Sequence, residues 1–225
     1  MNYINNLISY RYKSLSLLSL SIGATLILLM IRMKLAHSYN YLFLVWNLFL
    51  AAVPYAITIY LVGIPKLNRI TLLFTFGTWL VFLPNAPYIL TDMWHLRYNE
   101  PHIFWLDILL ISAFAFNGMM LFYFSVSDMK TVLLKYFNKT KTHFILTFVF
   151  FISAFGVYLG RFLRYNSWEI LTNPKVLFID IINIIVQPLG NKDVWLFTLL
   201  FGAFFTLGHW VFTNINMASK NEKQE

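Results

Sequence analysis

Apolar residues gather in six long runs, separated by shorter polar segments. A membrane-spanning helix needs about 20 predominantly apolar residues, because the hydrocarbon core is ~30 Å thick and each helical residue rises ~1.5 Å. The third run is short only if it stops at Pro84, since the apolar pattern resumes beyond it. The pattern therefore predicts an all-α, polytopic membrane helix bundle with about six transmembrane helices. The runs are Leu15 to Ile31, Tyr41 to Val62, Ile70 to Leu83, Ile103 to Val126, Phe144 to Leu159 and Val194 to Ile215.

Two of the segments between the apolar runs also contain signals for short helices. In the segment PNAPYILTDMWHLRYNEPH, Pro84 and Pro87 interrupt the third apolar run, and Asn85 is expected to cap a new short helix. Residues 174–187 form an apolar stretch that begins at a proline and is closed by Pro188. At ~14 residues such a helix is ~21 Å long, too short to span, and we expect it to be interfacial or re-entrant. A seventh crossing is the competing interpretation.

Composition supports a lipid environment. Apolar residues make up 59% of the 225 residues and charged residues 12%, against roughly 25% charged residues in soluble domains. Cysteine is absent, which excludes disulfides, iron–sulfur clusters and thiol catalysis. The first run has no cleavage site after it, so it is expected to be retained. We divide the chain into an N-terminal cytoplasmic segment (1–14), one transmembrane domain (15–215) and a polar C-terminal tail (216–225).

Basic residues favour one orientation. If the N-terminus is inside, ten of the 17 lysines and arginines lie in inner segments and seven in outer loops. Because cytoplasmic loops are enriched in Lys and Arg, we expect a multi-pass cell-membrane protein with both termini cytoplasmic. The formal charge of +8 is then explained by orientation and by contact with anionic membrane lipids, and no nucleic-acid partner is expected.

Ionisable residues at membrane depth usually face protein or a water-filled cavity. Tyr88, Asp92, His95 and Asn99 follow one another at helical spacing, and Asp107 begins the fourth run. This pattern predicts a polar pocket on the outer face, with Asp92, His95 and Asp107 as the candidate catalytic residues for acid–base chemistry. In the alternative, the residues are structural. Asp92 and His95 would then cap helices and pair with a neighbouring arginine of the same loop.

A second polar stretch follows the fifth run. Gly156 and Gly160 have the spacing that lets two helices pack closely, which would hold Arg161 near the outer headgroups. Arginine binds phosphate or carboxylate with two parallel hydrogen bonds. An anionic lipid or lipid-linked substrate is the expected ligand, although snorkelling arginines or ion pairs with the aspartates would explain the same pattern. The candidate binding residues are Arg161, Arg164, Tyr88, Asn85 and Trp168.

The PNAPYILTD stretch (84–92) and the GRFLRYNSW stretch (160–168) resemble those of the bacterial multi-pass membrane proteins catalogued as domain of unknown function 1361. The likeness runs from about residue 40 to residue 213. It implies a bacterial inner-membrane protein and supplies no activity or substrate.

Three functions stay open. The first is an outer site that binds or processes an anionic lipid, and whether it catalyses a reaction is undecided. The second is a small transporter or channel with a polar path through Asn117 to His209. The third is an assembly subunit, with homo-oligomers formed through small-residue helix faces. No P-loop, nucleophile elbow, zinc-protease motif or dinucleotide fingerprint is present. No cofactor and no metal are expected, because Asp92, His95 and His102 lack a defined ligand spacing.

Overall fold

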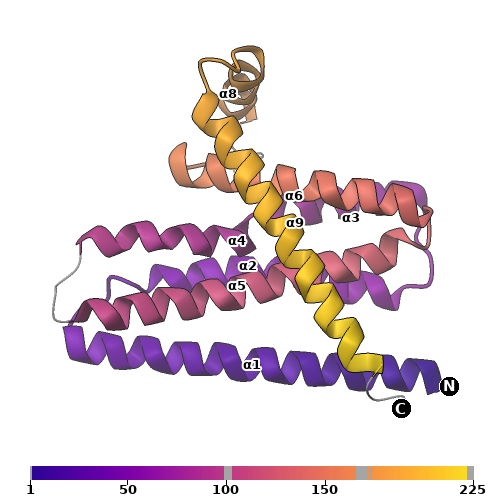
Figure 1. The fold of residues 1–225 in the computed structure, drawn as a ribbon, viewed down its shortest axis with the longest axis horizontal. Coiled ribbons are helices and arrows are strands. Elements are labelled where there is room, and N and C mark those ends of the chain that lie inside the picture. The colour runs from indigo at the N-terminus through magenta and orange to yellow at the C-terminus, as the bar shows by residue number, and fades with distance from the viewer. Residues whose placement is uncertain (1, 99–102, 166–171, 173, 222–225) are drawn as a thin grey trace.

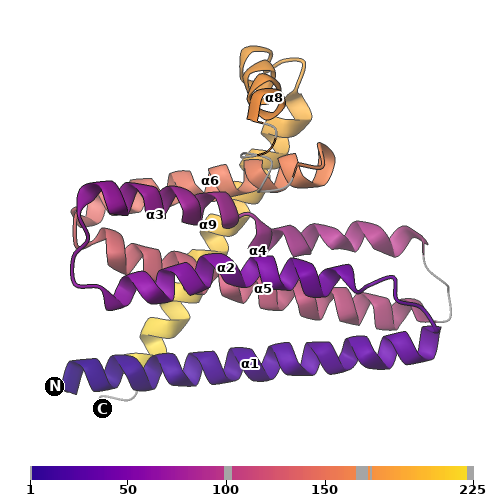
Figure 2. The same ribbon diagram turned by 180° about the vertical axis from the view of Figure 1, so that it is seen from behind.

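A computed structural model describes residues 2–98, 103–165, 172 and 174–221. These residues form helices and connecting turns without a strand, and six helical segments are long and apolar enough to cross a membrane. The all-α membrane bundle is therefore confirmed (Figures 1 and 2). The helices are α1 (Asn2–Ala36), α2 (Phe43–Gly63), α3 (Arg69–Phe82), α4 (Asn85–Tyr88), the 3-10 helix η1 (Ile89–Tyr98), α5 (Phe104–Leu133), α6 (Lys139–Phe162), α8 (Pro174–Val186) and α9 (Lys192–Asn221).

The two ends of the bundle are distinct. We call the end where η1 finishes and α5 starts the η1 end, and the opposite end, where α1 begins and α9 finishes, the terminal end (Figure 1). The start of α1 and the end of α9 lie on the same side of the bundle in both views, as an even number of crossings requires. The helices extend further than the predicted runs. α1 is helical from Asn2, and α9 continues to Asn221, where we expected a polar tail.

Helix α5 forms the centre of the bundle. It packs against α1, α2, α4, η1 and α6, and most of its side chains are buried, including Phe114 and Phe122. A helix that is apolar around its whole circumference is expected to be surrounded by protein or lipid. The other spanning segments are less buried than α5 and leave most of their residues at the surface of the bundle.

The third spanning segment is broken where the prolines predict it. α3 ends at Phe82, α4 adds one turn that contains Pro87, and η1 carries the chain on as a 3-10 helix. Proline lacks an N–H group and cannot continue the hydrogen-bond ladder. The predicted capping role of Asn85 is wrong. Pro84 is the cap residue, and the Asn85 amide donates back to the carbonyl of Phe82 at 2.9 Å.

Glycines hold this broken segment between two helices. A Cβ atom on Gly118 of α5 would lie 2.5 Å from the carbonyl oxygen of Ala86, and one on Gly156 of α6 would lie 2.6 Å from Pro84. One turn further on, a Cβ on Gly160 would lie 3.2 Å from the ring of Tyr88. The close packing expected from small residues is therefore present, and it fixes α4 and the start of η1 against α5 and α6.

Helix α8 has 13 residues, fewer than a crossing needs, so the seventh-crossing interpretation is wrong. It begins at Pro174 as predicted and stands off the bundle beside the N-terminal end of α9 (Figures 1 and 2). Most of its apolar side chains are exposed, among them Phe178, Ile182 and Val186. A short helix with this surface fits the expected interfacial or re-entrant position.

Candidate functional site

A buried carboxylate and a guanidinium meet where η1 packs against the last turn of α6. Arg161 forms an ion pair through Nη2 with Oδ1 of Asp92. Its Nε donates to the hydroxyl of Thr91 at 2.8 Å. The guanidinium carbon lies 4.5 Å from the ring centroid of Tyr88, a cation–π distance. Glycine packing of α6 against α4 allows this approach, since Gly160 lies against the same tyrosine ring.

Asp92 is 1% exposed and is satisfied on both oxygens. Oδ1 accepts from Arg161, and Oδ2 accepts from the Asn47 amide of α2 at 2.9 Å. A buried carboxylate is costly unless it is paired and hydrogen-bonded. These partners therefore explain why an acid can lie here, and they connect three helical segments at one point.

His95 is the exposed member of the cluster. In a 3-10 helix residues three apart lie on one face, so His95 follows Asp92 directly and its Nε2 lies 3.9 Å from Oδ1 of Asp92. The same nitrogen lies 3.4 Å from Nη1 of Arg161. Since a guanidinium only donates, a hydrogen bond between these two side chains has Nε2 as its acceptor. The side chain is 43% exposed and rests against the ring of Phe43.

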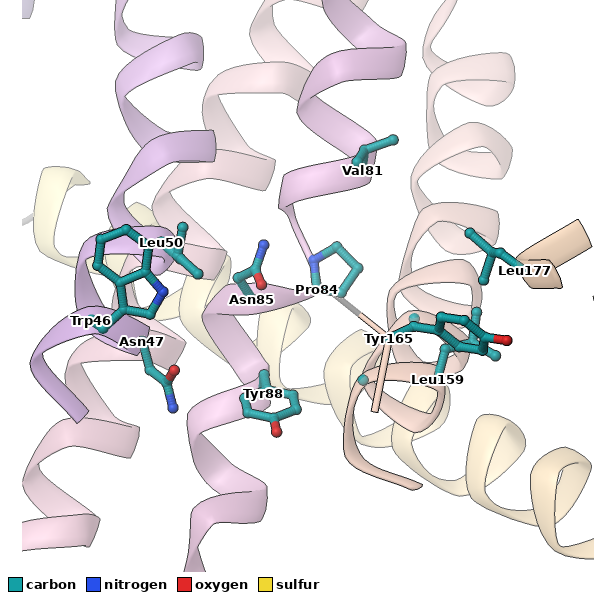
Figure 3. Close-up of a pocket in the computed structure, with 12 residues that line it drawn as sticks. Trp46, Asn47, Leu50, Val81, Pro84, Asn85, Tyr88, Leu159, Tyr165 and Leu177 are labelled. Atoms are coloured by element: carbon teal, nitrogen blue, oxygen red, sulfur yellow. The ribbon is translucent and has the colours of Figure 1, made fainter. Parts of the chain in front are cut away.

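A pocket of about 170 Å³ adjoins the cluster and shares Asn47 and Tyr88 with it. Figure 3 shows its side chains coming from α2, the broken segment at Pro84, α6 and α8. The wall mixes polar and apolar side chains. The lining residues are Trp46, Asn47, Leu50, Val81, Pro84, Asn85, Tyr88, Gly156, Leu159, Gly160, Tyr165 and Leu177. The pocket is smaller than the 300–1,000 Å³ usual for drug-sized ligands. Its size therefore fits a lipid headgroup or the end of an acyl chain.

Asp107, one of the three candidate catalytic residues, lies outside this cluster. It is 0% exposed and pairs with Arg32 of α1, with Nε to Oδ1 at 2.8 Å and Nη2 to Oδ2 at 3.5 Å. Arg32 also lies 4.5 Å from the ring centroid of Tyr41. The pair fastens α1 to α5, so Asp107 has a structural partner that the sequence did not reveal. The prediction ended the first helix at Ile31 and left Arg32 in a loop.

Only some of the other predicted binding residues lie at the pocket. Tyr88 and Asn85 line the pocket. Arg164 does not join Arg161, because α6 ends at Phe162 and Arg164 takes a φ of 61° with its side chain exposed. Trp168 lies outside the described residues. Asn47 and Thr91 are contacts that the sequence analysis missed. A polar residue within the second apolar run is the signal that could have indicated Asn47.

The Tyr165 hydroxyl closes one side of the pocket by donating to Oδ2 of Asp180 on α8 at 2.6 Å. Within the described part of the chain, no three His, Cys, Asp or Glu side chains gather closely enough to hold a metal ion. His102, one of the weak metal candidates, is outside that part.

Comparison with known proteins identifies a family and supplies no activity. A search of curated proteins and a search of solved structures each found no match. A family profile described as "Protein of unknown function (DUF1361)" matches residues 46–207. This range runs from α2 into α9 and contains both the broken segment and the last turn of α6. The chain is an integral membrane protein and belongs to this family.

Proposed function

We propose that the cluster of Asp92, His95 and Arg161 binds the anionic headgroup of an outer-leaflet lipid or lipid-linked molecule. The observation that carries the proposal is that partners of the ionic cluster also line a pocket with a mixed polar and apolar wall. Asn47 and Tyr88 belong to both the ionic cluster and that wall. A headgroup at the cluster and an apolar end in the pocket would use both surfaces.

The chemistry of Arg161 fits phosphate or carboxylate. A guanidinium has five N–H donors, and the contacts to Thr91, His95 and Asp92 use three of them. Asp92 balances the positive charge of Arg161 and also holds its guanidinium in place. The fixed guanidinium loses less conformational entropy when a ligand binds. His95 adds an exposed imidazole, which can donate a hydrogen bond to the ligand. His95 is therefore the group best placed to move a proton if the ligand is processed.

The transport alternative has weak structural support. Asn117 is buried, and its amide donates to Thr25 and to the carbonyl of Ala113, both at 2.9 Å. The stretch of α5 around it is lined by buried apolar side chains, including Phe114 and Phe122. A polar path toward His209 would have to pass through this packed core. We therefore favour a binding site at one face over a channel.

The assembly alternative rests on α1. A Cβ on Gly23 would meet nothing within 4 Å, and Ser19, four residues earlier, is exposed. This small-xxx-small spacing is typical of helix–helix contacts in membranes. The mass of the protein in nanodiscs distinguishes a monomer from a homo-oligomer, and a glycine-to-leucine change at this position should abolish an oligomer formed through α1.

We also propose that the η1 end faces outward in a bacterial inner membrane, with both chain termini in the cytoplasm. Four lysines lie at the terminal end, in the last turn of α5, in the turn that follows it and at the start of α6: Lys130, Lys135, Lys139 and Lys141. Lysine-rich short loops are typical of the cytoplasmic side. This orientation would give the cluster access to molecules of the outer leaflet.

Native mass spectrometry of the protein in lipid nanodiscs tests the proposed binding. We expect wild type to carry a distinct anionic lipid or metabolite that Arg161→Ala loses. Arg164→Ala is the matched control, because it removes an exposed arginine three residues away and should retain the bound species. The paired variant Asp92→Asn/Arg161→Gln removes both charges together and avoids a lone buried carboxylate. Wild type without a bound species, or variants that bind equally, would contradict the proposal.

A further inference from the structure

A second hollow lies at the terminal end of the bundle and shares no lining residue with the pocket beside Asp92 and Arg161. It has a volume of about 880 Å³ and opens between the start of α3, the end of α5 and the start of α6. This volume is within the range of pockets that hold small-molecule ligands. Its lining residues are Lys66, Leu67, Asn68, Arg69, Leu72, Leu73, Phe76, Leu133, Lys135, Tyr136, Phe137 and Ile145.

The walls of this groove are apolar. Its apolar lining comes from three helices, with Leu73 and Phe76 on α3, Leu133 on α5 and Ile145 on α6. α3 packs on α2 and buries few side chains, and its neighbouring residues Ile70 and Phe74 are largely exposed. The groove is therefore continuous with a helix surface that faces the hydrocarbon of the bilayer. An acyl chain is the material available to fill it, because an unfilled apolar gap loses its dispersion contacts.

The rim of the groove is basic. Lys66 and Arg69 are exposed, and no acidic residue is among the twelve side chains that line the groove. Asn68 between them accepts from the backbone N–H of Thr71 at 2.7 Å and so caps the start of α3. The N-terminal end of this 14-residue helix adds a positive partial charge beside the two cations.

The rim is also held in shape by the end of α5. Lys135 donates through Nζ to the carbonyls of Val62 at 3.2 Å and Ile64 at 2.6 Å. The Tyr136 hydroxyl accepts from the backbone N–H of Leu67 and donates to its carbonyl at 3.0 Å. Both ends of the loop between α2 and α3 are thereby fixed, so the two cations are presented by a preformed segment. Preorganisation reduces the ordering cost of binding.

We propose that this groove binds an anionic glycerophospholipid of the leaflet at the terminal end. Its phosphate lies between Lys66 and Arg69, and one acyl chain lies against Leu73, Phe76 and Ile145. Basic pockets between transmembrane helices are suited to lipid headgroups of this charge. The unbalanced positive rim selects an anionic headgroup over a zwitterionic one. This lipid site is separate from the cluster at the η1 end and does not depend on the function proposed for it.

Competition between two lipids tests this site. The protein is placed in nanodiscs of equal phosphatidylglycerol and phosphatidylcholine with identical acyl chains, released into detergent, and the lipids that remain bound are counted by native mass spectrometry. We expect wild type to retain phosphatidylglycerol preferentially. Each basic residue near an anionic surface strengthens binding about five-fold, so Lys66→Gln/Arg69→Gln should weaken retention about 25-fold.

A matched control separates the site from general charge. Lys139→Gln/Lys141→Gln removes the same charge from exposed residues at the start of α6 that do not line the groove, and it should leave retention at the wild-type level. Ile145→Trp keeps every charge and narrows the groove, and it should reduce retention of both lipids. Equal retention of the two lipids by wild type would overturn the proposal. Equal losses in the two double variants would also overturn it.

Discussion

The buried ion pair between Arg32 and Asp107 predicts a strong energetic coupling between α1 and α5. Two nitrogen–oxygen contacts of 2.8 and 3.5 Å join the side chains, and both residues are nearly inaccessible to solvent. Removing one partner of such a pair typically costs about 3–5 kcal/mol, because the other charge stays buried, whereas replacing both by apolar residues is close to neutral. Arg32→Met and Asp107→Leu should each destabilise by that amount, and the double variant should lie within about 1 kcal/mol of wild type.

A double-mutant cycle measures this coupling. Independent changes would sum to about 6–10 kcal/mol, so the expected coupling free energy is at least about 5 kcal/mol. The free energy of unfolding can be followed by circular dichroism during reversible denaturation in mixed detergent micelles. Single changes that each cost less than about 1 kcal/mol and simply add would match an exposed ion pair. That result would refute the burial of Arg32 and the packing of α1 on α5.

Two further predictions concern packing and orientation. Gly118→Ala should lower the unfolding temperature and reduce the free energy of unfolding by about 1–3 kcal/mol, because the new Cβ would lie 2.5 Å from the carbonyl oxygen of Ala86. Gly23→Ala is the control and should be neutral or slightly stabilising, because a Cβ there meets nothing within 4 Å. Equal effects of the two changes would contradict the glycine contacts. Because the chain lacks cysteine, single cysteines at Tyr39 and Asn138 can be labelled with an impermeant maleimide. They should react from opposite sides of the membrane, Tyr39→Cys from outside, and labelling from one side would contradict the proposed orientation.

The parts of the fold that depend on local signals could be predicted from the sequence. Run length determines which segments can span a bilayer, and that criterion found all six spanning segments. Pro84 and Pro87 marked the break after α3, and Pro174 and Pro188 bounded α8. Each of these signals acts on the backbone within a few residues, so no knowledge of neighbouring helices was needed.

The partners across helices could not be predicted, because they depend on how each helix is rotated about its axis. Asn47 and Asp92 are 45 residues apart, and Arg32 and Asp107 are 75 apart. Asp107 was grouped with Asp92 because both were expected at one face, yet α5 presents Asp107 to α1. Similarly, Arg164 would lie near Arg161 only if α6 continued, and the helix ends at Phe162.

An experimental structure of the protein in lipid nanodiscs, determined by cryo-electron microscopy with a bound antibody fragment, would show whether the cluster of Asp92, His95 and Arg161 holds a ligand. We expect density for a headgroup within hydrogen-bonding distance of Arg161 and His95, continuing into the pocket beside Pro84 and Tyr88. A pocket without ligand density, or one in which Arg161 lies away from Asp92, would contradict the proposed binding site.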